Sequence, residues 1–360
     1  MPVLILLLLA GACSNTGSAD DTAGPESTDS DSATAEQTGA EAELPGYRAG
    51  LYPTGFATER KNLNGTHELV DVGFPRDVQP DDIVIETIEM PYPALMYTRE
   101  PDEIFVIGGT PLGLDQYVSF IDRLPPGDNE TDPYFAKYNP ETGDITYLDL
   151  DRGSGVPYLG GALVHADGYV YVVSQSHLYR VEPESMEVEA SVDLPAAGPD
   201  TVYNGLAVGR TGQLILKSTS FGSGAGALHL VDPDTLDIAF TTDCACRSPR
   251  LTLAVDDSGT EHLYHLNREQ TFRYIVEEDS LTLDGSWVAG FDPDGTGTNK
   301  EPTSPVVLNG RVFYTTNTDL SSELPMRVFW QDQNGTYTPD MAPLEGPLLF
   351  EDPDGRAGLS

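Results

Sequence analysis

The sequence is poor in basic residues. Its 360 residues include 19 Lys and Arg against 58 Asp and Glu, so the formal net charge is −39. A chain this acidic repels phosphate backbones and anionic headgroups, which excludes a nucleic-acid binder and argues against electrostatic attachment of the folded body to a membrane. Membrane attachment would therefore need a hydrophobic or covalent anchor.

Uninterrupted helical blocks are also absent. The 36 Gly and 28 Pro are spread along the whole chain and favour one large all-β domain. Hydrophobic residues make up 39% of the sequence, which is enough for a core and excludes disorder of the whole chain. The apolar run at residues 3–9 is far too short to cross a bilayer.

That apolar run leads into an Ala-Gly-Ala-Cys sequence ending at Cys13. Small residues before a Cys suit a signal peptidase cleft, and the segment resembles a bacterial lipoprotein signal peptide. The resemblance implies that residues 1–13 are the signal peptide and that Cys13 becomes the lipidated N-terminus, in the periplasm or on the cell surface. An ordinary secretory signal is the alternative, and both place the mature protein outside the cytoplasm.

Residues 14–46 are expected to form a disordered acidic linker. From 14 to 44 they hold eight carboxylates and no basic residue, and burial cannot offset the ordering entropy of such a segment. The linker would hold a folded domain at residues 47–360 away from the membrane. In that domain Cys244 and Cys246 form a close pair, either a local disulfide or two small loop residues.

Two sequence motifs recur along the folded part of the chain. A Pro-acidic turn between alternating strands appears three times, with its prolines spaced by 43 and 50 residues, at Pro140, Pro183 and Pro233. A strand, a Gly turn and a second strand appear four times, and the turn glycines are 168, 212, 259 and 310. Together they give four short strands in each period of about 45 residues.

This periodicity predicts an all-β fold, a β-propeller with six or seven four-stranded blades. A single four-stranded sheet cannot cover both of its faces, so copies pack face to face around an axis. The stretch 47–90 and the C-terminal residues are left for further blades. A two-sheet sandwich is the alternative, but it does not require repeats of this length.

The turn motif at residues 139–143 resembles repeats of bacterial propellers of the YVTN and quinoprotein-dehydrogenase type. The resemblance covers roughly residues 90–340 and implies the fold. The chain has two Trp, Trp287 and Trp330, and neither lies in a tryptophan-docking motif, so the resemblance gives little support for a quinone cofactor.

A shorter match begins at Asn204 and reads Asn-Gly-Leu-Ala-Val, followed by Gly212. It is similar to a strand of the gluconolactonase and senescence-marker family. That resemblance implies a metal-dependent lactonase in which Asn204 is a ligand of a divalent cation in the central channel. Lys217 stands near the place where the family has an Asp, and a Lys would oppose a cation.

Alignment of the repeats places polar residues just before the innermost strands. Tyr203, Asn204, Arg250 and Glu301 are therefore expected at the channel mouth as a ligand-binding site. The alternative is that they are loop residues facing water. The arginines around Arg250 would suit an anionic ligand, or they neutralise neighbouring carboxylates.

A second candidate site is a partial calcium loop. Asp292, Asp294 and Thr296 place oxygen side chains at alternate positions before a Gly, as Ca²⁺ prefers, although position twelve is Thr303 rather than Glu. The same Asp-Pro-Asp-Gly sequence is also a common turn.

No Ser, Cys or His stands in a recognisable catalytic motif, so no catalytic residue is predicted. The sequence thus favours an exported, lipid-anchored propeller that binds a small molecule or a protein, or acts as a scaffold. The alternative is a lactonase-like hydrolase with its site in the central channel.

Overall fold

The computed structural model describes residues 3–8, 46–67, 84–91, 93–109, 132–151, 160–196, 201–220, 226–244, 250–267, 270–290, 304–315, 328–333, 350–351 and 357–358. Several predicted features lie outside these residues: Cys13, Cys246, Glu301, the calcium loop with Asp292, Asp294 and Thr296, and the linker up to residue 45. Within the described ranges, no helix is long and apolar enough to cross a membrane.

Four four-stranded antiparallel sheets follow one another along the chain. Blade 1 is β3 (Pro93–Thr98), β4 (Ile104–Gly108), β5 (Tyr134–Tyr138) and β6 (Ile145–Asp149). Blade 2 is β7 (Gly161–Val164), β8 (Val170–Ser174), β9 (His177–Val181) and β10 (Val188–Asp193). Blade 3 is β11 (Thr201–Val208), β12 (Leu214–Ser220), β13 (Gly226–Val231) and β14 (Ile238–Cys244). Blade 4 is β15 (Thr252–Val255), β16 (Glu261–Leu266), β17 (Gln270–Val276) and β18 (Leu281–Gly290).

A fifth sheet and two strand pairs complete the described elements. Blade 5 is β19 (Val306–Leu308), β20 (Arg311–Thr315) and β21 (Val328–Asp332). One pair joins β1 (Val3–Leu8) to β2 (Val84–Glu89), and the other joins β22 (Phe350–Glu351) to β23 (Ala357–Gly358). Since β1 lies in the predicted signal peptide, cleavage before Cys13 would remove it from β2.

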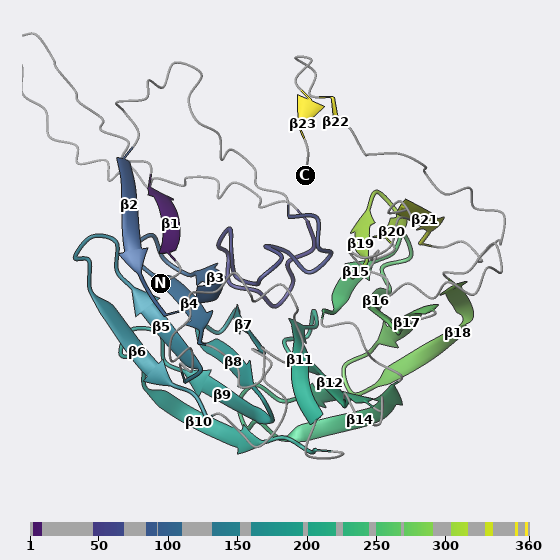
Figure 1. The fold of residues 1–360 in the computed structure, drawn as a ribbon. Helices are drawn as coiled ribbons and strands as arrows, with labels where there is room; N and C mark the ends of the chain where they lie inside the picture. Colours follow the sequence, from purple (N-terminus) through teal and green to yellow (C-terminus); the bar gives the residue numbers. More distant parts are fainter. Residues whose placement is uncertain are drawn as a thin grey trace, which may run out of the picture.

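The sheets are arranged around a common centre (Figure 1). Within every blade, strands that are neighbours in the sheet are consecutive in the chain. The first strands lie toward the middle, where β7 contacts both β3 and β11, and β15 contacts β19. The predicted all-β propeller of four-stranded blades is therefore confirmed. Four blades are complete and a fifth has three strands in the described part, so the total of six or seven stays a prediction.

The recurring Pro-acidic motif forms the turn between the third and fourth strands of a blade. In blade 1, Asn139 Oδ1 accepts the backbone N–H groups of Glu141 and Thr142 at 2.8 and 3.1 Å. Glu182 in blade 2 and Asp232 in blade 3 make the same pair of contacts. The side-chain oxygen before the proline thus accepts two backbone N–H groups of the turn that form no hydrogen bond to a neighbouring strand.

The four predicted turn glycines lie in the hairpins between first and second strands. All four have positive φ, from 71° at Gly310 to 94° at Gly168. This left-handed region is strained for residues with a Cβ, so the turn geometry explains why glycine recurs there.

The segment 46–67, which we name the hub segment, runs across the middle of the propeller. It exchanges backbone hydrogen bonds with Thr98 of β3, Val164 of β7, Leu253 of β15 and Val307 of β19. Gly50 also lies against Val208 of β11. The hub segment therefore touches the first strands of all five blades. Residues 47–90 were left for a further blade, and the described part of them, 46–67, lies against these first strands.

The hub segment belongs to the same apolar core as the blades. Its Leu51, Ala57 and Leu63 are buried in one cluster with side chains of blades 1 to 4. Because this segment carries no repeat of its own, the sequence pattern gave no indication of its position. These three side chains anchor the hub segment against the first strands.

Candidate functional site

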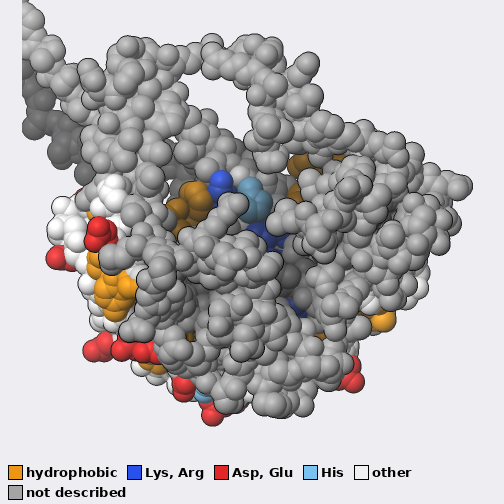
Figure 2. Space-filling view, in the orientation of Figure 1, with side chains coloured by type: hydrophobic (Ala, Val, Ile, Leu, Met, Phe, Trp, Pro, Cys, Tyr) orange, Lys and Arg blue, Asp and Glu red, His pale blue; other side chains and the backbone are white. Residues whose placement is uncertain are grey.

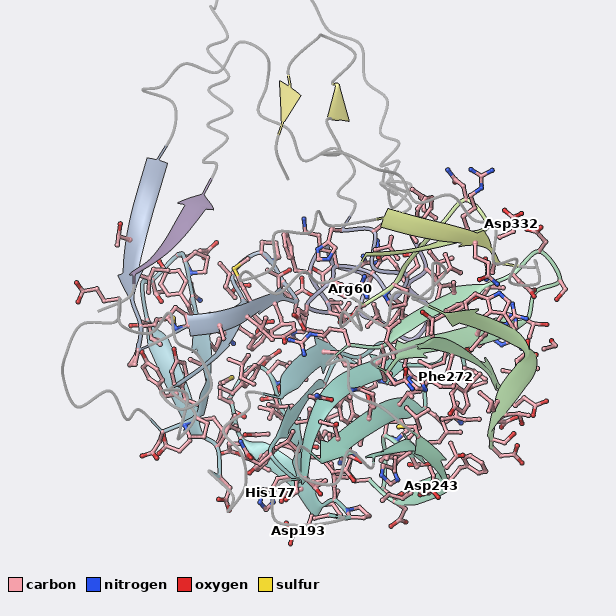
Figure 3. All side chains as sticks on the ribbon, turned by 45° about the vertical axis from the view of Figure 1, so that its right-hand side comes forward. Arg60, His177, Asp193, Asp243, Phe272 and Asp332 are labelled. Atoms are coloured by element: carbon pink, nitrogen blue, oxygen red, sulfur yellow. The ribbon has the colours of Figure 1, made fainter. Side chains whose placement is uncertain are left out.

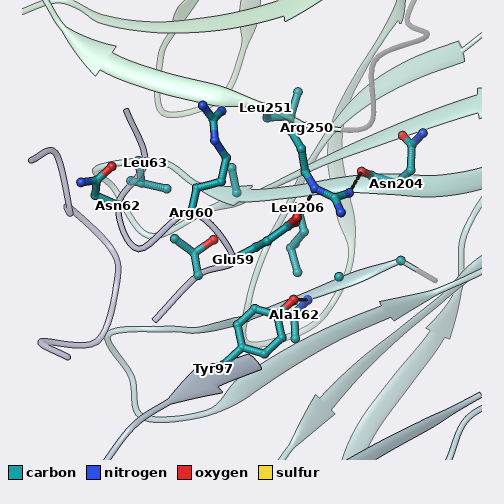
Figure 4. Close-up of a pocket in the computed structure, with 14 residues that line it drawn as sticks. Glu59, Arg60, Asn62, Leu63, Tyr97, Ala162, Asn204, Leu206, Arg250 and Leu251 are labelled. Atoms are coloured by element: carbon teal, nitrogen blue, oxygen red, sulfur yellow. Dashed lines mark hydrogen bonds and ion pairs between the residues drawn. The ribbon is translucent and has the colours of Figure 1, made fainter. Parts of the chain in front are cut away.

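A pocket lies where the hub segment crosses the first strands (Figure 4). Its empty space, counted together with the part open to solvent, is about 430 Å³. The lining residues come from the hub segment and from the first strands of blades 1 to 4 or the residues before them. They are Thr58, Glu59, Arg60, Asn62, Leu63, Tyr97, Gly160, Gly161, Ala162, Asn204, Leu206, Ala207, Arg250 and Leu251.

Arg250 joins the hub segment to blade 3. It lies just before β15, and its Nε forms an ion pair with the Glu59 carboxylate. Its Nη1 donates to the backbone carbonyl of Asn204 at 3.1 Å (Figure 4). The Arg250 side chain is 21% exposed, so the guanidinium is shielded from water yet still reaches the pocket wall. Coulombic attraction is stronger in such a site than in bulk water.

Arg60 places a second guanidinium beside the same pocket. Its Nη1 donates to Thr252 Oγ1 at 2.7 Å and its Nη2 to the Pro305 carbonyl at 2.8 Å, so it links the hub segment to blades 4 and 5. Burial lowers the pKa of Arg60 to about 10, with Glu59 opposing and Arg250 adding to the effect. Arg60 therefore stays protonated at neutral pH and contributes a full positive charge.

Asn204 and its neighbour Tyr203 have different surroundings. Asn204 lines the pocket and is only 2% exposed, and its Oδ1 has no hydrogen-bond partner among the residues that the structure describes. Tyr203 is fully buried inside β11, where its hydroxyl donates to the Pro195 carbonyl at 2.7 Å and lies 3.0 Å from His229 Nε2. Tyr203 is therefore bonded within blade 3 and is not among the pocket residues.

Lys217 is a third basic residue close to Arg250. In the β11–β12 ladder it pairs with Gly205, and it is completely buried. A Cβ on Gly205 would lie 3.0 Å from both Cβ and Cε of Lys217, so the glycine makes room for the lysine stem. Burial, followed by the nearby Arg250 charge, lowers the pKa of Lys217 well below its usual range.

The structure brings together two of the four residues predicted at the channel mouth, Asn204 and Arg250. Tyr203 is directed elsewhere, and Glu301 lies outside the described residues. The sequence reading missed Glu59 and Arg60. Arg60 and Lys61 form an adjacent basic pair in a chain with few basic residues, and that rarity is the signal that could have drawn attention to them.

Of the two predicted metal sites, only the one at Asn204 lies among the described residues. In the part of the chain that the structure describes, no group of three or more His, Cys, Asp or Glu side chains is arranged to hold a metal ion. Glu59 is the one carboxylate among the described residues that line the pocket, and it is paired with Arg250. Cys244 is disulfide-bonded, as one of the two alternatives for the close cysteine pair requires.

No protein-family model matches the sequence, and no similar curated protein was found. Solved structures of low similarity include a protein of unknown function from Bacteroides caccae, with 10% identity, a TM-score of 0.39, and coverage of 66% of this chain and 71% of that one. Another is the calcium-binding protein regucalcin from Agrobacterium tumefaciens, with 14% identity, a TM-score of 0.41, and coverage of 72% and 76%.

A third is the WD40 domain of SCAP from fission yeast, with 10% identity, a TM-score of 0.40, and coverage of 70% of this chain and 56% of that one. This chain thus spans little more than half of the length of that neighbour. The propeller assignment rests on the order of the strands and the arrangement of the sheets, and not on these similarities.

Proposed function

We propose that this chain is an exported, lipid-anchored β-propeller that binds a ligand in the axial pocket between the hub segment and blades 1 to 4. The observation that carries the proposal is the convergence of Arg60, Arg250 and Asn204 on one pocket from three separate parts of the chain. Polar groups that converge on a partly enclosed space are typical of small-molecule sites. The leader ending at Cys13 supports export and anchoring in the periplasm or on the cell surface.

The chemistry of the donors favours binding over the lactonase alternative. A divalent cation beside Asn204 would need several oxygen ligands. The described part of the pocket lining offers one carboxylate, Glu59, which is already paired with Arg250. Lys217 lies opposite Gly205 in the next strand, where the resemblance would place an Asp ligand, and its side chain has no oxygen to offer a metal ion. The residues present do not fit the cation that the family resemblance implies.

A pocket-filling variant tests the proposal. Gly161 lines the pocket, and a Cβ there would have Tyr97 Oη at 4.0 Å as its nearest neighbour, so Gly161→Leu adds bulk at the pocket wall where its first atom has room. We expect some small molecule in a panel of succinate, phosphate, succinamide, glucose and choline to raise the melting temperature of the wild-type chain, because a ligand that binds only the native state stabilises it. The same compound should leave the melting temperature of Gly161→Leu unchanged.

A shift of equal size in Gly161→Leu would contradict the proposed site, as would the absence of any shift at millimolar concentrations. Hydrolysis of a simple lactone in the presence of Ca²⁺, lost in Asn204→Ala, would support the lactonase instead. If the propeller instead binds a protein at its surface, none of the small molecules should shift the melting temperature of either chain.

A further inference from the structure

Blade 1 carries apolar side chains on both faces of its sheet. Phe105, Ile107 and Phe135 belong to the main core cluster, which also contains side chains of blades 2 to 4. The alternate residues of the same strands form a second cluster, together with two residues that precede blade 1. Its members are Ile88, Met90, Ile104, Val106, Tyr134, Ala136 and Tyr138. Because successive residues of a strand point to opposite faces, the second cluster is the face of blade 1 that is turned away from blade 2.

The strand β2 covers part of this second face. Ile88 and Met90 are buried, whereas Thr87 and Glu89 are exposed, so one side of β2 lies on blade 1. β2 belongs to a different sheet from blade 1, and three residues separate its end at Glu89 from the start of β3. A fourth strand, such as β6 or β10, likewise comes before the first strand of the next blade. β2 therefore has the position of a fourth strand in a sheet next to blade 1.

The cover that β2 gives to this face is incomplete. Tyr147 of β6 pairs with Ala136 in the blade 1 ladder, which places it on the same face, and it is 46% exposed. Its ring packs edge-on against Tyr134. Figure 2 shows hydrophobic side chains exposed on the left flank of the molecule, over blade 1. Exposed apolar area beside β2 is what further strands of a neighbouring sheet would bury.

The partner of β2 in the structure is a strand of the leader. β1 pairs with β2 antiparallel over six residues, from Val3 opposite Glu89 to Leu8 opposite Val84. Residues 3–8 precede Cys13, so export of the chain as proposed above would remove them. β2 would then present a row of backbone N–H and C=O groups, and such an edge recruits another strand.

The C-terminal hairpin has the features of the missing strands. β22 and β23 pair antiparallel, with Phe350 opposite Gly358. Residues 347–359 read as an apolar strand, an Asp-Pro-Asp-Gly turn and a second strand, and Gly355 lies 45 residues after Gly310, the turn glycine of blade 5. That distance is one repeat, so the hairpin corresponds to the first two strands of the next blade. A two-stranded hairpin is marginally stable by itself and needs further strands.

The position of the hairpin agrees with this role. Strand contacts and the shared core join blade 1 to blade 5 in chain order. β22 and β23 lie between β2 and the end of blade 5 in the view of Figure 1. The turned view of Figure 3 agrees, with the hairpin between β2 and Asp332, the last residue of β21.

We propose that the C-terminal hairpin, residues 347–359, pairs with β2 in the mature protein and completes a sheet between blade 5 and blade 1. The leader strand β1 holds the place of the hairpin on β2 until the leader is removed. The hairpin supplies the first strands of this sheet, and β2 supplies its outer strand. The inference rests on the proposed function only for the removal of the leader.

Hydrogen exchange of the backbone amides of residues 84–89 tests the pairing in a chain that starts at residue 14. Ala357→Pro removes a backbone N–H of β23 and disrupts the hairpin. We expect these amides to exchange at least about tenfold faster in Ala357→Pro than in the unmodified chain, because they lose their strand partner. Ser360→Pro, outside the hairpin, is the matched control and should stay within about twofold of the unmodified chain.

A chain that keeps the leader tests the competition between β1 and the hairpin. Cys13→Ala removes the acceptor thiol of the lipid, so residues 1–13 stay attached. In this chain we expect Ala357→Pro to leave the exchange of residues 84–89 slow, since β1 remains paired with β2. Fast exchange in the leader-containing Ala357→Pro chain would contradict the place-holding role of β1.

Disulfide cross-linking identifies the partner of β2 directly and decides the question if Ala357→Pro does not fold. Thr87→Cys, at an exposed position of β2, is combined with single cysteines at residues 348–351 and 356–359 in the chain that starts at residue 14. A disulfide requires Cα atoms within about 7 Å, so at least one pair should cross-link within one chain. Thr142→Cys, exposed in the turn between β5 and β6, is the matched control and should not cross-link to the same cysteines.

A cross-link within one chain would support the inference and show which strand of the hairpin adjoins β2. A cross-link between two chains would overturn it in favour of a second copy as the partner. Fast exchange of residues 84–89 in the unmodified chain, or slow exchange that a folded Ala357→Pro variant does not change, would overturn it as well. These measurements need neither export nor a pocket ligand, so their failure is distinct from a failure of the proposed function.

Discussion

Gly205 and Lys217 show how one missing side chain permits a buried lysine. Gly205 lies opposite Lys217, and a Cβ added there would approach two Lys217 carbons at 3.0 Å and Leu251 Cγ at 3.2 Å. Contacts this short require neighbours to move, and overpacking of a core typically costs about 1 to 3 kcal/mol. Packing against Lys217 therefore explains the glycine of the Asn-Gly-Leu-Ala motif.

We accordingly expect Gly205→Ala to lower the free energy of unfolding by about 1 to 3 kcal/mol, measured by urea denaturation. Gly285 in β18 is the matched control, since its φ is not positive and a Cβ there would meet nothing within 4 Å. Gly285→Ala should change stability by less than about 0.5 kcal/mol. Equal losses in the two variants would show that close packing at Gly205 is not the cause.

His265 gives the protein a sensitivity to acid. The ring is fully buried in β16, with Phe272 and Tyr274 at 5.2 and 5.3 Å between ring centroids. Burial, followed by the charge of Lys217, lowers the pKa of His265 to about 3. Because the unfolded value is about 6.5, stability is complete above pH 6.5 and is lost as the pH falls from 6.5 toward 3, at about 1.4 kcal/mol per pH unit.

His265→Phe keeps the aromatic packing and removes the titration. The free energy of unfolding of this variant should fall less steeply than that of wild type between pH 6.5 and pH 4, as followed by denaturant titrations at each pH. The difference between the two slopes isolates His265 from the many surface carboxylates. Parallel curves would mean that His265 does not have a depressed pKa.

At the scale of the elements, cations on the third strands tie neighbouring blades together. Lys137 of β5 donates to the carbonyl of Pro183 in blade 2 at 2.9 Å. Arg180 of β9 donates to the carbonyls of Pro233 and Asp234 in blade 3 at 3.2 and 2.7 Å. Both cations stand three residues before the proline of their own turn, so the repeat also encodes a contact with the next blade.

Arg180→Met retains the aliphatic stem and removes the donors. We expect a loss of about 1 to 2 kcal/mol in unfolding free energy, since two carbonyls lose a charged partner. Arg311→Gln in blade 5 is the comparison, because Arg311 is half exposed and its ion pair is long. Its unfolding free energy should stay within about 0.5 kcal/mol of wild type. If the two variants behaved alike, the contacts between blades 2 and 3 would not contribute to stability.

At the scale of the whole molecule, the hub segment connects blades that are distant in sequence. It bonds to β3, β7, β15 and β19 and contributes Leu51 and Leu63 to the core. Removing it would expose apolar side chains and leave backbone groups of the first strands without partners. The propeller and its axial pocket therefore depend on a segment outside the repeats.

A chain starting at residue 68 is expected to lose cooperative thermal unfolding, or to melt at least about 10 °C below a chain starting at residue 46. The second chain is the control, since it lacks the predicted leader and linker but keeps the hub segment. Addition of a peptide spanning 46–67 should restore part of the melting temperature. Identical melting of the two chains would show that the hub segment does not stabilise the blades.

The repeated sequence motifs were sufficient by themselves to predict the all-β propeller fold. Turn glycines with positive φ, oxygen side chains before prolines and alternating strands act over a few residues, so their pattern is visible along the chain. The prediction of Asn204 and Arg250 near one opening also followed from this pattern, because equivalent positions in repeated units lie at equivalent places around the axis.

Only the tertiary structure decided what lies at that axis. Arg60 reaches partners 192 and 245 residues farther along the chain, and Glu59 pairs with Arg250. No local signal specifies such contacts, since they form when a non-repeating segment packs against first strands that the propeller has already brought together. Tyr203 and Asn204 differ because the register of the β11–β12 ladder shifts between Tyr203 and Gly205. Asn204 is the extra residue at this shift and lines the pocket, whereas Tyr203 is buried and its hydroxyl donates to the Pro195 carbonyl.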